Sequence, residues 1–426
     1  MRDLRNGKIL RRAAGWIVLP LLACLLQATA CTTMVARKNL PYPLTTDRFG
    51  DPVKVVTLPL PAISATPNGG VTYGGLTAFL LHDANDQVDT LLAPQINFNP
   101  NFGVTGTVYG AFSISPDLDI EFNASKSTKV DEDFMIRIRD KTFLDGRLEL
   151  TSFLFAFTDG SARFFGFHAT SREEKETNFG DREIGFALSA GYDVTDHFRI
   201  VGGERLRSVN VVGGAITSLP FIRDAFVPGA VPGIDGFTAH AQKLAVVYDT
   251  TDRSTVPTRG VFASASAEGS LRALGSSADF VRFELEAKGY LPLLDDRVIT
   301  AGRFVSTQVR GSGVPFLERS VLGGEDTLRG FGRSRFIDMG AILLNIEERI
   351  QVLRYRLFNV DTHWEVAPFV DIGTVMESLG RIDRHEVQVN PGIGFRAGAR
   401  PNVLGRIDVG YGKEGFAVYV GLKYPF

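Results

Sequence analysis

Cysteine is scarce in this chain, because only Cys24 and Cys31 occur among its 426 residues. Both lie near the N-terminus, so no disulfide framework can hold the rest of the protein together. Long apolar runs are also missing beyond the first thirty residues, since 22% of the chain is charged and the mean hydropathy is only +0.04. A bundle of membrane-spanning helices is therefore excluded.

The sequence also lacks an excess of one charge and the common cofactor motifs. A net charge of −2 gives no sign of nucleic acid as a partner. No glycine-rich phosphate loop, nucleotide-binding fingerprint or metal-ligand spacing occurs. The six histidines are scattered, and no nucleophile with an acid–base partner stands out. We therefore expect neither an enzyme nor a small-molecule cofactor.

Phenylalanine and glycine are abundant, with 32 and 45 residues, and the last eleven residues show how apolar residues are arranged. One side of an extended strand over 416–426 would carry Phe416, Val418, Val420, Leu422, Tyr424 and Phe426. The other side would carry the mixed set Ala417, Tyr419, Gly421, Lys423 and Pro425. This alternation suits a strand between lipid and a water-filled barrel, although a half-buried strand of a soluble sandwich has the same period.

Charged residues alternate with apolar ones in the second half of the chain. In 281–288, for example, Arg282, Glu284, Glu286 and Lys288 share one face. Burying such a row in a dry core would be costly, so a wet and charged lumen is the better interpretation. The sequence thus predicts an all-β fold, a transmembrane antiparallel β-barrel over 70–426.

The predicted barrel has about sixteen strands. Candidates lie at 103–114, 117–128, 133–144, 147–158, 184–194, 197–210, 242–250, 259–270, 279–292, 297–309, 341–352, 363–374, 387–399, 403–412 and 415–426. Two further segments, 71–81 and 88–98, raise the count to an odd seventeen, so we expect one of them not to be a separate strand. Long connections at 159–183, 211–241 and 310–340 alternate with short turns, and we place the long ones outside the cell. The third, between strands 11 and 12, is expected to fold inward.

The first thirty residues have the pattern of an export signal. Residues 1–30 contain a basic start, an apolar stretch and a small-residue cleavage site ending at Ala30. Cleavage there would make Cys31 the first mature residue and a candidate for lipidation, with Cys24 as the alternative. The proline-rich residues 31–69 are expected to form an extended periplasmic lead-in.

Two motifs carry a family resemblance. Residues 322–331 include Leu328, Arg329, Gly330 and Phe331, and Phe369, Asp371 and Gly373 follow on a predicted strand. In order and spacing these resemble the two signature motifs of the BamA/TamA outer-membrane assembly superfamily, also called the bacterial surface antigen family. The resemblance covers roughly 70–426 and implies that the loop enters the barrel and that its arginine meets the strand aspartate. Asn345, Glu347 and Arg349 match the family's polar strand after this loop.

The chemistry of an arginine–aspartate pair supports that expectation. A guanidinium at the tip of a glycine-bounded turn offers a planar fork of donors, which a carboxylate on the lumen face can accept at two positions. The alternative is that Arg329 is solvated and that Asp371 pairs with Arg349 or Arg396.

The resemblance has two further implications. Gly421, Tyr424 and Phe426 match the C-terminal pattern by which barrel precursors are recognised during assembly. Members that insert or translocate proteins carry POTRA domains, but the interval from Cys31 to Gly70 is too short for one. We therefore expect a barrel of this family lacking POTRA domains.

The expected function is insertion or translocation of protein or lipid at the bacterial outer membrane. Expected partners are outer-membrane lipids and either barrel-assembly machinery or client polypeptides. The alternative is a loop-plugged pore or structural surface antigen that handles no client. Crosslinks to nascent barrels would favour the first interpretation, and a large stable conductance would favour the second.

Overall fold

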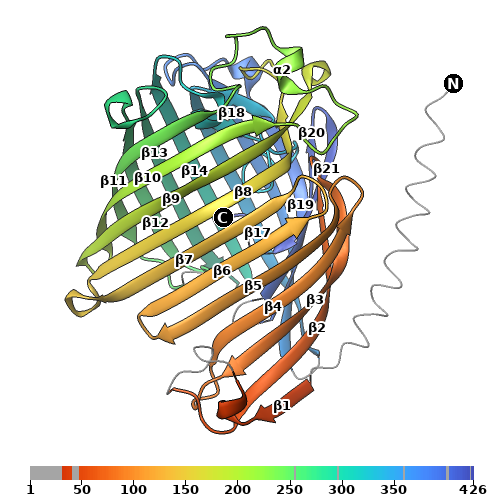
Figure 1. The fold of residues 1–426 in the computed structure, drawn as a ribbon, viewed down its shortest axis with the longest axis vertical. Coiled ribbons are helices and arrows are strands. Elements are labelled where there is room, and N and C mark those ends of the chain that lie inside the picture. The colour runs from red at the N-terminus through yellow and green to blue at the C-terminus, as the bar shows by residue number, and fades with distance from the viewer. Residues whose placement is uncertain are drawn as a thin grey trace, which may run out of the picture.

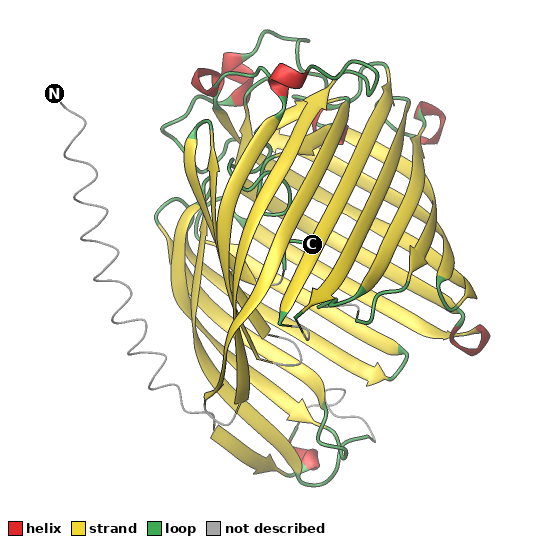
Figure 2. Cartoon of the chain, turned by 180° about the vertical axis from the view of Figure 1, so that it is seen from behind, coloured by secondary structure: helices red, strands yellow, loops and turns green. Residues whose placement is uncertain are grey.

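The computed structural model describes residues 31–40, 48–253, 256–294, 297–357, 360–399, 403–422 and 424–426. The expected signal peptide and Cys24 lie outside these residues. The described chain is a closed antiparallel barrel, and helices are confined to its connections (Figures 1 and 2). No helix among the described residues is long and apolar enough to cross a membrane.

Eighteen strands form the barrel within the described ranges, and a nineteenth, β1 (Cys31–Val35), pairs with β2 at the edge of the same sheet. The barrel strands are β2 (Val53–Thr66), β3 (Gly70–His82), β4 (Val88–Asn99), β5 (Gly103–Ser115), β6 (Leu118–Ser127), β7 (Glu132–Phe143), β8 (Leu148–Phe164), β9 (Thr177–Thr195), β10 (Phe198–Val212), β11 (Phe237–Asp249), β12 (Gly260–Ser270), β13 (Phe280–Leu293), β14 (Val298–Gly311), β17 (Gly340–Leu357), β18 (Val360–Met376), β19 (Gln388–Ala399), β20 (Val403–Gly412) and β21 (Gly415–Leu422).

Short elements occupy the connections. They are η1 (Arg37–Asn39), η2 (Leu144–Gly146), η3 (Glu173–Lys175), α2 (Ile222–Ala225), η4 (Arg272–Leu274), η5 (Phe316–Glu318) and η6 (Arg384–Glu386), with a small separate hairpin of β15 (Ser320–Leu322) and β16 (Phe336–Asp338).

The predicted strand count of about sixteen is too low. Residues 71–81 and 88–98 form two separate strands, β3 and β4, so the expectation that one of them is not a strand is wrong. Strand β2 was not predicted at all. It lies inside the range 31–69 assigned to a lead-in and pairs with β3 over its length, so the barrel begins before Gly70.

The predicted alternation between an apolar and a polar face is confirmed. Ile136 and Leu154 are opposed across β7 and β8 and both are exposed on the outside. Their neighbour Arg137 faces the lumen, where it donates to Glu121 on β6 at 3.0 Å. Because successive side chains point to opposite faces of each strand, the barrel has an apolar outer surface and a polar interior.

Long and short connections alternate, as the sequence predicts. The long ones, 165–176, 213–236 and 312–339, are separated by short turns such as 196–197. Residues 312–339, here called the inner loop, join β14 to β17 and contain η5, β15 and β16.

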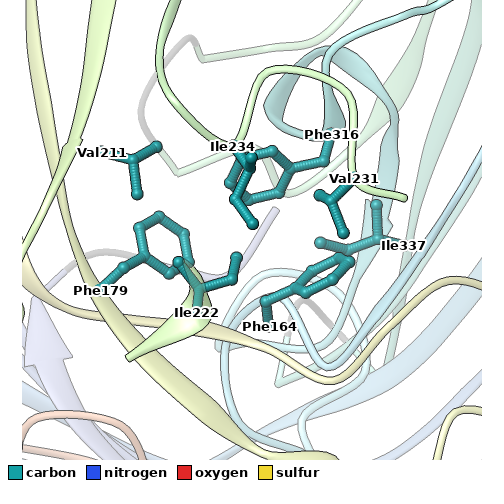
Figure 3. Packing of buried hydrophobic residues seen from close by; sticks show 8 residues of the cluster. All are labelled: Phe164, Phe179, Val211, Ile222, Val231, Ile234, Phe316 and Ile337. Carbon is teal, nitrogen blue, oxygen red and sulfur yellow. The ribbon is translucent and has the colours of Figure 1, made fainter. Parts of the chain in front are cut away.

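An apolar cluster fixes the inner loop to the ends of β8, β9 and β10. Phe316 of the inner loop is fully buried, with ring centroids 5.3 Å from Phe164 and 5.4 Å from Phe179 in edge-to-face geometry. Figure 3 shows these rings with Val211, Ile222, Val231, Ile234 and Ile337 around them. Edge-to-face aromatic pairs add to the gain from burial, so this end of the loop is firmly packed.

The first and last strands of the barrel meet at a weak junction, here called the seam. Strands β2 and β21 share one ladder pair, Ala65 with Val420. The other end of the same β2 edge, Val53–Thr57, pairs with β1, which lies beside β2 at the lower end of the barrel (Figure 1).

Candidate functional site

The structure brings Arg329 and Asp371 together. Arg329 is fully buried, and its Nε and Nη2 donate to Asp371 Oδ2 and Oδ1 at 2.9 and 2.8 Å. The backbone N–H of Arg329 donates to Asp371 Oδ2 as well, at 3.0 Å. One carboxylate therefore holds both the side chain and the main chain of the loop tip.

Four further charged residues join this pair in what we call the ion network. Arg329 Nη1 donates to Glu347 Oε2 at 2.7 Å. Arg349 and Arg396 each donate to Glu347, at 3.1 Å, and Arg396 also donates to Asp408 at 2.6 Å. The network, Arg329, Glu347, Arg349, Asp371, Arg396 and Asp408, draws its partners from β17, β18, β19 and β20. Three cations balance three carboxylates, which is the condition for burying such charges.

The alternative pairing of Asp371 is thus not what the structure shows. Arg349 and Arg396 bind Glu347 and Asp408, while Asp371 is used by Arg329 and by Asn345, whose Nδ2 donates to Asp371 Oδ1 at 2.8 Å. Burial alone would lower the pKa of Arg329, but the hydrogen bonds and charge of Asp371, with the charges of Glu347 and Asp408, raise its pKa. The guanidinium therefore stays charged.

The other residues of the two motifs shape the space around the pair. Leu328 and Phe331 are buried with Leu322, Phe336 and Leu343. The Phe369 ring lies under the guanidinium, with its centroid 3.4 Å from Arg329 Cζ, which is a cation–π contact. A side chain at position 330 would clash with its surroundings, because a Cβ on Gly330 would lie 2.5 Å from Asn390 Nδ2. Gly373 is similarly crowded, since its Cβ would meet Ile342 O at 2.8 Å.

A second group of charges holds the inner loop to another part of the barrel wall, on β10 and β13. Glu318 is buried and accepts from Arg205 at 3.1 Å, Arg207 at 2.8 Å and Arg282 at 2.9 Å. These arginines lie on β10 and β13. Burial favours the neutral acid, but the charges of the arginines prevail and lower the pKa of Glu318 to about 2.

The inner loop also contacts both sides of the seam. Asn68, in the turn between β2 and β3, binds the backbone of Arg333 twice: it accepts from the N–H at 2.8 Å and donates to the oxygen at 3.0 Å. On the other side, Tyr419 of β21 donates to Phe331 O, and Arg335 pairs with Glu414 at 2.7 Å.

The C-terminal residues are placed differently from the prediction. Strand β21 ends at Leu422, and Tyr424 and Phe426 do not continue its apolar outer face. The Tyr424 hydroxyl donates to Glu365 at 2.6 Å. The centroid of the Tyr424 ring lies 4.0 Å from Arg349 Cζ, so the ring stacks against the guanidinium. The backbone oxygen of Phe426 accepts from Arg349 at 2.9 Å. The expectation that both aromatic side chains face lipid is therefore wrong, because polar lumen groups hold them inside.

Sequence reasoning missed Asp408, Glu318, Arg205, Arg207 and Asn68. Arg205 and Arg207 were detectable, since their spacing of two puts both on one face of a strand. Glu318 and Asn68 lie in irregular segments, where no periodicity marks them. Of the remaining candidates, Gly421 lies on the lumen side near Glu325, and Cys31 is exposed at the start of β1. No group of three or more His, Cys, Asp or Glu among the described residues is placed to hold a metal ion.

Comparisons with known proteins agree with this geometry. The model of the Omp85 superfamily domain matches residues 118–412. Among solved structures, BamA from Haemophilus ducreyi lacking POTRA domains 1-3 matches with a TM-score of 0.54 and 14% identity, over 95% of this chain and 77% of that one. CdiB from Acinetobacter baumannii matches with a TM-score of 0.44 and 11% identity, over 94% and 67%.

A search of curated proteins found no match. At 14% identity the BamA structure establishes the fold alone, whereas the family model spans more than half of the chain. The family resemblance of the two motifs is thereby confirmed. This protein belongs to the Omp85 superfamily.

Proposed function

We propose that this protein acts at the bacterial outer membrane in the insertion or translocation of polypeptide or lipid. The observation that carries the proposal is the seam, where β2 and β21 share a single ladder pair. A barrel whose other neighbouring strands pair over most of their length can open there at the lowest cost in backbone hydrogen bonds. The family membership supports this proposal, since barrels of this family are typical of the bacterial outer membrane.

The inner loop would control the opening. Its tip is held by the ion network, and the residues that directly follow the tip, Phe331 and Arg333, contact Tyr419 on one side of the seam and Asn68 on the other. A change in the loop would therefore reach both edges. Outer-membrane lipids, a client polypeptide and assembly machinery are the proposed partners.

Locking the seam tests the proposal. Ala65→Cys and Val420→Cys, in a Cys31→Ser background, place two thiols on the one opposed pair of the seam. Joined by a short reducible crosslinker in liposomes, the protein should lose its ability to insert an unfolded test barrel or to transfer fluorescent lipid, and reduction should restore it. The matched control is Val108→Cys with Ala124→Cys, an opposed pair between β5 and β6. Undiminished activity of the locked seam would contradict the proposal.

A second function, a loop-plugged pore, is favoured by the buried position of the loop tip in the lumen. Planar-bilayer conductance distinguishes it. A large, stable current that needs no partner, together with no insertion or transfer activity, would support the pore.

A further inference from the structure

The lumen wall next to the seam is largely apolar on β2 and β3, whereas β4 places Gln95 and Asn97 on the same face, opposite Leu76 and Gly74. Leu91, Ala111, Glu121 and Arg137 are successive cross-strand partners from β4 to β7, so they share one face of the sheet. Because Arg137 and Glu121 face the lumen, Leu91 does too. The same register places Val56, Leu58, Leu60, Leu76 and Leu80 of β2 and β3 on this face.

The outer face of these strands is apolar as well. Val71, Tyr73 and Ile96 are exposed there. Strands β2 and β3 therefore present apolar side chains to both the outside and the lumen, although the interior of a membrane barrel is normally polar.

The edge of β2 at the seam cannot readily accept another strand. The ladder between β2 and β3 runs through Pro59 and Pro61 without a register shift. Proline has no N–H, so this is possible only if both nitrogens face away from β3, toward the seam. The Thr33 hydroxyl of β1 donates to Val55 O of β2 at 3.5 Å, so the backbone carbonyl of an odd-numbered β2 residue faces β1. The odd-numbered residues of β2 therefore direct their backbone groups to this seam edge.

Most of that edge is open. Among the described residues, Leu58–Ser64 have no ladder partner on the seam side, since the pairing of β2 with β1 stops at Thr57 and its pairing with β21 is at Ala65. The backbone nitrogen and carbonyl groups of Pro59, Pro61 and Ile63 face the seam. Of these three residues only Ile63 has an N–H that can donate a hydrogen bond. A strand added at this edge would lack two hydrogen bonds. Prolines on the edge strands of other sheets discourage pairing with a further strand in the same way.

We propose that the seam and the apolar lumen wall of β2 and β3 bind the acyl chains of a membrane lipid. This rests on the proposed function and names its substrate class as lipid. An acyl chain needs no hydrogen bond from the β2 edge, whereas a polypeptide strand does. A chain entering through the seam passes from the outer apolar face to Leu60 and Leu76, opposed on the inner face, without meeting a charged wall.

Photolabelling in vesicles tests the proposal. The full chain is reconstituted into phosphatidylethanolamine vesicles with a trace of phosphatidylcholine that carries a diazirine in its acyl chain, and labelled residues are mapped by mass spectrometry. Labels are expected on Leu58, Leu60 and Leu76 as well as on the outer residues Tyr73 and Ile96. Labels confined to the outer residues would overturn the proposal.

Two variants sharpen this result. Leu60→Gln with Leu76→Gln should lower labelling of the inner face about tenfold, since each change replaces an aliphatic side chain that favours an apolar partner. The matched control, Ile96→Gln with Val108→Gln on the outer face, should leave inner labelling unchanged. If the inner pair fails to fold, the labelling pattern of the unaltered protein still decides.

The prolines allow a separate test against a polypeptide occupant. A biotinylated peptide with the sequence of residues 415–422 should be captured by the Pro59→Val, Pro61→Val variant and not by the unaltered protein. Equal capture by both would show that the edge accepts strands, which contradicts the proposal.

The labelling needs no transport, so its outcome is independent of the transfer assay. Inner labelling without insertion or transfer would overturn the proposed function alone. Polypeptide insertion without inner labelling would overturn the lipid assignment alone.

Discussion

Strands β17–β20 and strands β2–β4 line the same lumen and present opposite chemistry to it. The first wall carries the ion network, which holds the tip of the inner loop through Asp371 and Glu347. The second wall carries leucine and valine on β2 and β3, with uncharged Gln95 and Asn97 on β4, and Asn68 at its end binds the loop. One side of the barrel is thus built to hold a polypeptide segment in place, and the other leaves the lumen surface free.

The difference explains where the barrel can open. Buried charges cost much free energy when a partner is removed, so β17–β20 and the loop behave as one rigid unit. Aliphatic residues beside a single ladder pair make no such demand, so separation of β2 from β21 costs less. Substitutions on the two walls should therefore have very different effects.

The largest effect is expected from Asp371→Ala. It leaves Arg329 buried with three of its four described hydrogen bonds gone, which should cost about 3–5 kcal/mol of stability, as in other broken buried ion pairs. Limited proteolysis should cut the inner loop of the variant rapidly, and the heat-modified band on a gel should appear at lower temperature.

Glu325→Ala is the matched control on the same loop. The Glu325 side chain is 44% exposed, and its buried partner Arg406 keeps Asp326 at 3.4 Å, so the loss should be smaller, about 1 kcal/mol. Equal protease sensitivity of the two variants would show that the network does not hold the loop. An exchange of the two residues, Arg329→Asp with Asp371→Arg, should not rescue the loop, because Asp371 also accepts the Arg329 backbone and Asn345.

A smaller effect is expected from Glu318→Gln. Hydrogen bonds to charged groups contribute about 1.5–3 kcal/mol, and the glutamine keeps some of them. Because the pKa of Glu318 is lowered to about 2, its charge contributes fully above its ordinary value of 4.5 and is lost as the pH falls toward 2.

The difference in unfolding stability between Glu318→Gln and the unaltered protein should therefore be constant from pH 7 to about 5 and vanish near pH 2. Glu284→Gln, a half-buried residue on the same face of β13 as Arg282, serves as the control. A difference that persists at pH 2 would mean that the charge of Glu318 is not the anchor.

The sequence predicted most of the barrel, for a physical reason. Where one face of a strand meets lipid and the other meets water, apolar and polar side chains must alternate at every residue. The predicted strand 403–412 accordingly has the same bounds as β20. Strand β2 was not predicted, because Pro59 and Pro61 suggest an unpaired segment. They are tolerated only because their nitrogens face the open edge, which is a property of the closed barrel and not of the local sequence.

The site was predictable in part. Arg329 and Asp371 could be paired because two motifs matched a family in order and spacing. That Glu347, Arg396 and Asp408 complete the network depends on the register of β17 to β20, which fixes which inward residues lie side by side. Tyr424 and Phe426 were misplaced because a period of two cannot show where a strand ends.

A still smaller effect is expected on the apolar side from Asn68→Ala. The variant loses two hydrogen bonds to Arg333, worth about 1–2 kcal/mol together at a partly exposed site. Hydrogen exchange of the Arg333 amide should speed up while the amide of Arg329 stays protected. Asn210→Ala, an exposed position on β10, is the control, and faster exchange at Arg329 as well would show that the loop moves as one piece.

The smallest effect is expected from Gly421→Ala, in contrast to Gly330→Ala. A Cβ at Gly330 would overlap Asn390 and come within 2.9 Å of Gly412 N, so overpacking should cost about 1–3 kcal/mol. A Cβ at Gly421 would only touch Glu325 Oε2 at 3.5 Å, an ordinary contact, so stability should change by less than about 0.5 kcal/mol. If Gly421→Ala nevertheless slows assembly into the membrane while the folded barrel unfolds as before, Gly421 acts during recognition of the unfolded chain. Equal assembly rates would leave Gly421 without that role.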